Sequence, residues 1–133
     1  MNKLFIVLLL FPILIFAQTG PKIEISDGDN INTGYHKRGV QLSYDIAFKN
    51  VGDADLKITA VQTSCGCSSA LAGSDAIKPG ETGIIKFTYN GQGMGIVSKV
   101  VTITTNETGS SSHNVTMTMN MADPVTLNPG SII

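Results

Sequence analysis

The residues with the clearest chemical potential are Cys65 and Cys67, the two cysteines of the 133-residue chain, which Gly66 separates. In a straight strand, side chains two residues apart lie on one face about 6.6 Å apart, whereas the Cβ atoms of a disulfide lie about 3.8 Å apart. A bridge between these cysteines therefore requires a bent backbone, which glycine permits. Alternatively, paired thiolates suit a soft metal such as copper(I) or zinc.

A disulfide that closes so short a loop stabilises the fold little, by about 1.5 kcal/mol from loop entropy before strain is subtracted. A strained, exposed bridge is also relatively easy to reduce. Three alternatives stay open for Cys65 and Cys67: an inert structural pair, a redox or thiol-exchange site, and a metal site. Zinc would need about four donors, and no second Cys/His pair is spaced to supply them. We therefore expect no cofactor, with copper or zinc as the alternative.

The two histidines give little support for catalysis. His36 lies beside Lys37 and Arg38, and His113 follows a run of serines, so both are predicted to be solvated loop residues. No serine, acid and histidine group has a recognisable motif around it, and the glycines lack the context of a phosphate-binding loop. We predict that the protein is not an enzyme.

The N-terminus indicates export. Asn2 and Lys3 precede an apolar run from Leu4 to Phe16, and Ala17 stands before polar sequence. This order is typical of a secretory signal peptide, and the run is shorter than the roughly 20 residues that span a bilayer. We predict a signal peptide over 1–17 and a mature protein in the periplasm or at the cell surface without a transmembrane anchor. The alternative is an uncleaved N-terminal anchor.

The mature chain, residues 18–133, has the length of a single domain. The formal net charge of the whole chain is −1, and such a near-neutral balance gives no electrostatic case for binding nucleic acid or an anionic membrane. Two cysteines are too few to build a disulfide scaffold, so ordinary packing must supply the core.

Runs with period-two alternation predict short strands along the whole domain. The expected strands cover residues 22–26, 41–50, 56–61, 83–89, 96–105 and 114–121. The segments expected to form turns and loops are 27–30, 50–53, 63–75, 90–95 and 106–112. Strands of this spacing, each with one apolar face, predict an all-β, immunoglobulin-like antiparallel sandwich.

Two further segments carry specific predictions. Lys78 to Glu81 is expected to form a type II turn, because Pro79 sets the angle at the first central position and Gly80 supplies the positive φ at the second. Met117, Met119 and Met121 could suggest a copper site, but their alternation with polar residues predicts that they fill the core.

Several motifs together resemble a known family. They are Phe48-Lys49-Asn50-Val51-Gly52, Leu56-Lys57-Ile58, Thr63-Ser64-Cys65-Gly66-Cys67 and Ile77-Lys78-Pro79-Gly80-Glu81, continued by Ser98-Lys99 and Thr105-Asn106. On these motifs the chain resembles the exported bacterial domain-of-unknown-function family 1573, most clearly over residues 41–121. The resemblance implies an immunoglobulin-like fold, related to the sandwich domains of cilium-associated and major-sperm-protein-like proteins. It implies no established activity.

The sequence therefore predicts a non-enzymatic binding or structural module of the cell envelope, with another envelope protein or a surface ligand as its partner. Loops and sheet edges are the natural interaction surfaces of a sandwich. Two loops are expected to contact a partner. The first is the Cys65 loop, with Ser64, Gly66 and Ser68, and the second is the turn with Pro79 and Gly80. The alternative is a thiol-based redox or copper-handling protein that uses the Cys-Gly-Cys loop.

Overall fold

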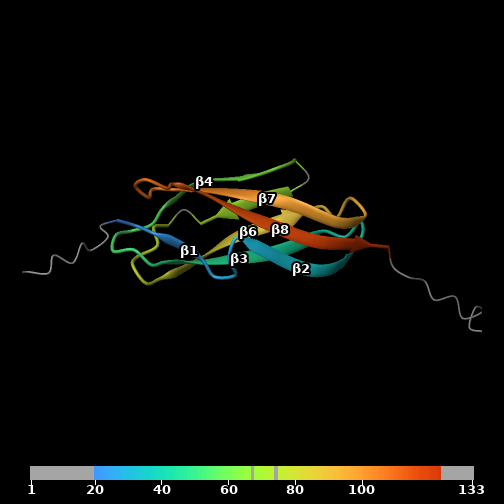
Figure 1. Ribbon diagram of the computed structural model, residues 1–133, viewed down its shortest axis with the longest axis horizontal. Helices are drawn as coiled ribbons and strands as arrows, with labels where there is room; N and C mark the ends of the chain where they lie inside the picture. The colour runs from blue at the N-terminus through green and yellow to red at the C-terminus, as the bar shows by residue number, and fades with distance from the viewer. Residues whose placement is uncertain (1–19, 67, 74, 124–133) are drawn as a thin grey trace, which may run out of the picture.

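The computed structural model describes residues 20–66, 68–73 and 75–123, and these residues form eight strands and no helix. The strands build two four-stranded sheets packed face to face (Figure 1). Sheet A has the order β1-β3-β6-β5, and sheet B has the order β2-β8-β7-β4. The bounds are β1 (Ile23–Ile25), β2 (Asn30–Lys37), β3 (Leu42–Asn50), β4 (Ile58–Thr63), β5 (Ser68–Ala72), β6 (Thr82–Tyr89), β7 (Gly95–Thr105) and β8 (Ser112–Ala122).

The predicted all-β sandwich is confirmed, and so are the six predicted strands, with their ends shifted by a few residues. Each of the long strands has one face in the core and one toward solvent, which is the pattern that makes alternation readable in a sequence. Two strands, β2 and β5, were not predicted. They are the strands whose sequences show no clear alternation of large apolar and polar residues.

Strand β2 corrects the prediction for the segment after Ile25. The turn expected over 27–30 ends earlier, because Asn30 already belongs to β2. After β1 the chain crosses from sheet A to sheet B, and β2 runs parallel to β8 rather than antiparallel. The sandwich is therefore antiparallel except for this one pair. His36 lies in β2 and is half-buried, so its placement in a solvated loop was wrong.

Strand β5 corrects the loop predicted over 63–75. The backbone of Ser68–Ala72 pairs in register with β6, from Ser68 opposite Tyr89 to Ala72 opposite Ile85. Its sequence is serine and alanine around a single leucine, and such small side chains give no pattern of large apolar and polar residues. Pairing with a long neighbouring strand, rather than local preference, makes this segment extended.

The core lies between the two sheets and consists of the inward faces of their strands. Strand β8 contributes most regularly, since Val115, Met117, Met119 and Met121 are each at most 1% exposed. The prediction that these methionines fill the core is confirmed. The other buried apolar residues are Ile23, Ile31, Ile46, Phe48, Leu56, Ile85, Phe87, Tyr89, Val101 and Ile103.

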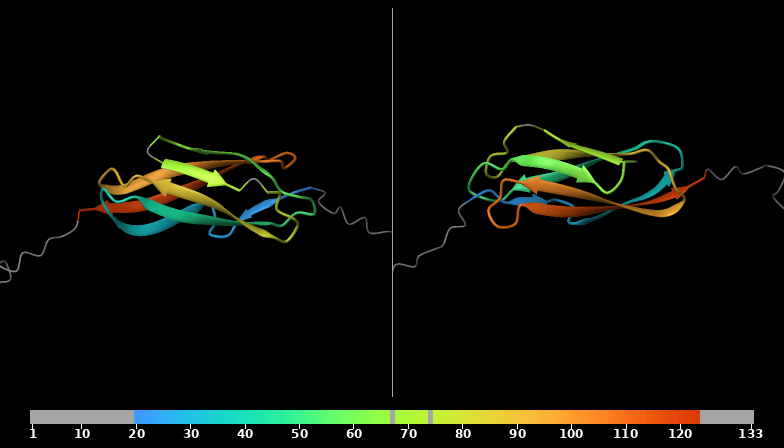
Figure 2. Two further views of the ribbon diagram at one scale, coloured as in Figure 1. Left: turned by 180° about the vertical axis from the view of Figure 1, so that it is seen from behind. Right: turned by 90° about the horizontal axis from the view of Figure 1, so that it is seen from above.

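The loops lie at the two ends of the sandwich (Figure 2). At one end lie residue 20 and the loops over 51–57, 75–81 and 106–111; we call it the motif end. At the other lie the loops over 38–41, 64–66 and 90–94, together with the last residues of β8; we call it the cysteine end. Figure 1 shows the blue start of the described chain and its red end on opposite sides of the domain.

The predicted signal peptide over 1–17 lies outside the described residues. Within the part of the chain that the structure describes, no helix has the length and apolar character needed to cross a membrane.

Candidate functional site

The Cys65 loop forms the tip that joins β4 to β5 at the cysteine end. Cys65 is half-buried and disulfide-bonded, and Cys67, the other cysteine of the chain, lies outside the described residues. Ser64 is tied to β7, because its N–H donates to the Val100 carbonyl at 2.9 Å and its Oγ accepts from the Val100 N–H at 3.1 Å. Gly66 has an ordinary φ, and a Cβ there would meet open space.

The Pro79 turn forms part of the motif end, and its predicted type II geometry is confirmed. The Glu81 N–H donates to the Lys78 carbonyl at 3.0 Å, and Gly80 has the required positive φ of 83°. The Gly80 N–H then donates to the Asn50 carbonyl at 2.8 Å, which docks the turn on the end of β3.

The two predicted interaction loops therefore lie apart. Ser68 pairs with Tyr89 at the end of β6, whereas Pro79 precedes the start of the same strand at Thr82. A strand of this length separates its two ends by about 23 Å. The Cys65 loop and the Pro79 turn cannot form one continuous contact surface, and each has to be judged with its own neighbours.

Asn50 is the centre of the motif end, and it is completely buried. Its Nδ2 donates to the carbonyls of Ala54 at 2.7 Å and Ile77 at 2.8 Å. Its Oδ1 accepts from the N–H groups of Gly52 at 3.0 Å and Lys22 at 3.3 Å. One side chain thus holds three loop segments together and leaves none of its polar atoms unsatisfied, as a buried amide requires.

Gly52 completes this junction because the chain passes too close to it for a side chain. A Cβ at Gly52 would overlap the Gly20 carbonyl and would lie 2.6 Å from the Lys22 nitrogen. Leu56, four residues later, is fully buried and forms a two-way backbone bridge with Ile77. The motif residues that carry the family resemblance at this end are thus explained by folding.

A second polar cluster at the motif end joins β1 to the β7–β8 hairpin, and its centre is Glu107. The Thr105 hydroxyl donates to Glu107 Oε2 at 2.6 Å, and His113 Nε2 lies 2.6 Å from the same oxygen. The Ile23 N–H donates to Oε1 at 3.1 Å. The prediction that His113 is a solvated loop residue was wrong, because it lies in β8 and is paired with Glu107.

These contacts set the protonation of Glu107. Burial alone would raise the pKa of its carboxyl group, but hydrogen bonds from Thr105, His113 and the backbone outweigh burial and hold the pKa below its ordinary value. The carboxylate is therefore kept charged and hydrogen-bonded on both oxygens, which suits a structural clasp better than proton transfer.

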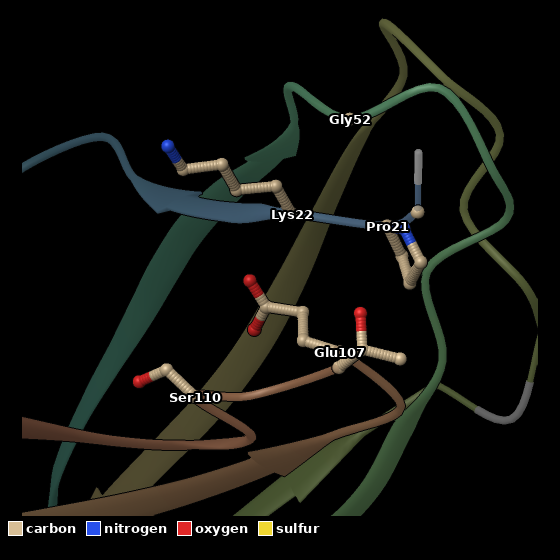
Figure 3. A pocket seen from close by; sticks show the side chains of 7 residues that line it. Pro21, Lys22, Gly52, Glu107 and Ser110 are labelled. Carbon is tan, nitrogen blue, oxygen red and sulfur yellow. The ribbon is translucent and has the colours of Figure 1, made fainter. Parts of the chain in front are cut away.

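A hollow of about 340 Å³ lies beside this clasp (Figure 3). Its walls come from Gly20 to Lys22, Gly52, and the β7–β8 loop with Glu107 and Ser110. Figure 3 shows the Glu107 carboxylate pointing toward β1, while the Lys22 side chain points away from the hollow. The Thr105 hydroxyl donates to the Glu107 carboxylate, but this hydroxyl is buried and the lowered pKa of Glu107 makes the carboxylate a weak base. The pair therefore does not favour a nucleophile activated by a general base.

The described residues contain no cluster of three or more metal-ligating side chains. Cys67 is not among them, so a copper or zinc role for the cysteine pair stays a prediction.

The structure also brings together residues that the sequence did not single out. Tyr35 on β2 and Ile96 on β7 are 80% and 76% exposed, and both border a groove of about 190 Å³ on the outer face of sheet B. In the sequence, the only sign of this groove is that Tyr35 and Ile96 are large apolar residues among polar ones. Because β2 was not predicted, the sequence could not show that Tyr35 and Ile96 lie on the same face of one sheet.

Comparison with known proteins gives a family and a fold. The model of the family described as "Protein of unknown function (DUF1573)" matches residues 24–121, and no curated protein matches the chain. A protein of unknown function from Porphyromonas gingivalis W83 is similar, with 22% identity, a TM-score of 0.67 and coverage of 84% of this chain. Only 51% of that protein is covered, so the present chain spans about half its length.

Two further structures share the sandwich. The ASH/PapD-like domain of human CEP192 has 10% identity and a TM-score of 0.60, with 92% of this chain and 99% of that domain covered. The periplasmic chaperone SfaE has 10% identity and a TM-score of 0.51, with 84% of this chain and 64% of the chaperone covered. At such identities the likeness concerns the fold.

Proposed function

Because the chain belongs to the DUF1573 family, whose description assigns no activity, we propose a function from the geometry of the domain: it is a non-enzymatic binding module of the bacterial cell envelope. The cysteine end contacts the partner, and the motif end holds the sandwich together. The partner is another component of the envelope, as the sequence predicted.

The observation that carries this proposal is where the exposed apolar side chains lie. Six large apolar residues are exposed among the described residues, and four of them lie at the cysteine end or next to it. Val40 and Met94 are in its loops, and Tyr35 and Ile96 are in the adjoining parts of β2 and β7. Scattered single apolar residues are normal on a surface, whereas a group of them marks an interaction site. The other two, Val51 and Ile84, lie apart from this group.

The loops that present two of these residues support each other. The Gly39 N–H donates to the Gly91 carbonyl at 2.9 Å, which joins the 38–41 loop to the 90–94 loop. Val40 and Met94 are therefore held out from a fixed backbone instead of from independent loops. A preorganised surface loses less entropy when a partner binds.

Export and the absence of catalysis are supported from other parts of the chain. Residues 1–17 have the pattern of a signal peptide, and the sandwich fold is shared with a periplasmic chaperone. The best acid–base pair in the described residues, Glu107 with His113, is saturated by structural hydrogen bonds.

The test uses a matched pair of variants, Val40→Ser and Ile84→Ser, because both parent side chains are 52% exposed. Fluorescently labelled mature protein is titrated onto cell envelopes isolated from the bacterium that produces it. We expect saturable binding that Val40→Ser weakens several-fold and Ile84→Ser leaves unchanged. Equal binding by the two variants, or no saturable binding by the parent, would remove the cysteine end from this role.

A second candidate function is favoured by the disulfide-bonded Cys65 at the same end. In thiol exchange, a partner's two thiols would become a disulfide while the bridge of this protein is reduced to two thiols. Incubation with a reduced dithiol protein, quenching with an alkylating agent and intact-mass analysis would detect this transfer. A bridge that stays oxidised against such a protein would leave only the binding role.

A further inference from the structure

Over the stretch in which β2 pairs with β8, strand β2 contains one extra residue. Asn32 lies opposite Thr118, but Tyr35 lies opposite Asn120, so three steps along β2 match two steps along β8. Successive side chains alternate between the faces of a sheet. Regular pairing from Asn32 would turn Tyr35 toward the core, and the extra residue turns it outward instead.

This bulge is held by hydrogen bonds from its own side chains. The Asn32 Oδ1 accepts from the Gly34 N–H at 2.9 Å, and the Thr33 hydroxyl donates to the Thr118 carbonyl at 3.3 Å. His36 Nε2 lies 3.0 Å from the Thr33 carbonyl oxygen. The fold thus fixes a bulge whose result is a tyrosine that is 80% exposed. Bulges often re-aim a side chain at a functional site.

Tyr35 is part of a row across three strands of sheet B. Asn120 on β8 lies between Tyr35 on β2 and Ile96 on β7, in register with both. Neighbouring strands are about 4.8 Å apart, so the side chains at the two ends of this row begin about 10 Å apart. The groove between them has a volume of about 190 Å³, which is the space of about six waters and suits one sugar ring.

The lining of the groove mixes apolar and polar groups and contains no charged side chain. It combines the aromatic ring of Tyr35 and the aliphatic Ile96 with the amides of Asn32 and Asn120 and the hydroxyl of Thr118. Among the described residues, the Asn120 carboxamide makes no hydrogen bond to another side chain. Its oxygen can accept and its NH2 group can donate two hydrogen bonds to a ligand.

This combination matches the chemistry of an uncharged sugar. The C–H face of a pyranose ring is apolar and packs on an aromatic ring, while its hydroxyl groups both donate and accept hydrogen bonds. A peptide that added a strand would pair with the edge of sheet B at β2, whereas this groove lies on the outer face of the sheet across β2, β8 and β7. We propose that the row of Tyr35, Asn120 and Ile96 binds a neutral sugar of an envelope glycan, an inference that rests on the proposed function.

The first test titrates the ¹⁵N-labelled mature protein with neutral oligosaccharides: maltohexaose, cellohexaose, mannohexaose and chitohexaose. We expect at least one of them to shift the Asn120 side-chain amide signals saturably. Tyr35→Ala should weaken that affinity about tenfold, and Tyr35→Phe should keep most of it, because the ring supplies the packing. Ile96→Ala should weaken binding, and its control Ile84→Ala should not. Failure of all four sugars to shift Asn120 would overturn the sugar proposal.

A second test separates this proposal from the general binding role. Envelopes are treated either with periodate, which cleaves sugar diols, or with a broad protease, and binding of the labelled protein is measured again. Loss after periodate, together with loss in Tyr35→Ala, supports the glycan. Loss after protease alone identifies a protein partner, which overturns the sugar proposal and leaves the proposed function standing. If Tyr35→Ala and Val40→Ser both bound the envelopes as tightly as the parent, the sugar proposal and the proposed function would both be wrong.

Discussion

The two ends of the sandwich differ in what their residues are bonded to. At the motif end, Asn50 and Glu107 hold neighbouring segments through hydrogen bonds that leave no buried group unsatisfied. At the cysteine end, large apolar side chains and the Asn120 amide face solvent instead. The family motifs at the motif end therefore maintain the fold. The residues that distinguish one member's partner from another's are expected at the opposite end, among the exposed side chains outside the motif over 63–67.

The strongest way to break the motif end is Asn50→Ala. The variant leaves two N–H groups and two carbonyls without their buried partner, at about 1–3 kcal/mol for each group that water cannot reach, so we expect a loss of about 3–5 kcal/mol in the free energy of unfolding. Urea denaturation measures it. Asn90→Ala is the control at the cysteine end, because Asn90 makes one exposed bond to the Gln92 N–H. A similar loss in the free energy of unfolding in both variants would contradict the proposed difference between the two ends.

Gly52→Ala should have the next largest effect, about 3 kcal/mol, since the new methyl group would push against the backbone of Gly20 and Lys22. Gly66→Ala makes the same chemical change at the cysteine end, where the Cβ meets open space. We expect its free energy of unfolding, measured in urea, to stay within about 0.5 kcal/mol of the parent's. Equal midpoints for the two alanine variants would show that Gly52 is not tightly enclosed.

Glu107→Gln tests the clasp and should cost about 2 kcal/mol near neutral pH, the usual value for hydrogen bonds to a charged group. The folded-state pKa of Glu107 lies below its unfolded value. Its stabilisation is therefore present above the unfolded pKa and is lost as the pH falls through the folded pKa. The stability difference between parent and variant should therefore shrink as the pH falls below 4.5, the ordinary pKa of a glutamate. A difference that stays constant as the pH falls would rule out the charged form as its source.

The smallest effect is expected from replacing both cysteines by serine. Opening so short a loop should change the free energy of unfolding by about 1 kcal/mol or less, because the bridge restricts the unfolded chain little. Denaturation of the oxidised parent and the double variant, both without reductant, measures the difference. A loss as large as that of Asn50→Ala would show that the cysteine end also stabilises the fold, against the proposed difference between the two ends.

The sequence was sufficient for the strands that obey simple alternation. Strand β8 is the clearest case, because every second residue from Val115 to Met121 is buried. Strand β2 was not predicted because its bulge at Thr33 and Gly34 interrupts the alternation of side chains, and β5 was not predicted because its small side chains show no alternation. The type II turn at Pro79 was readable because it depends on two adjacent residues.

The site residues were harder to predict because their roles are set by distant partners. Asn50 bonds to Ile77, 27 residues away, and Glu107 bonds to Ile23 across 84 residues. Pairing of Glu107 with His113 needs the register of the β7–β8 hairpin, which a pattern does not supply. Tyr35 needs both the parallel neighbour and the bulge before its exposure can be known.

The extra residue in β2 has a consequence for how the family can diversify. Deleting one codon at Thr33 or Gly34 would remove the bulge and restore regular pairing with β8, and Tyr35, then two residues after Asn32, would stay on the outer face opposite Asn120. A length difference of one residue at this point is therefore neutral for the direction of Tyr35. Related chains with one residue fewer between their equivalents of Asn32 and Tyr35 should accordingly lack the bulge and still present this position on the surface.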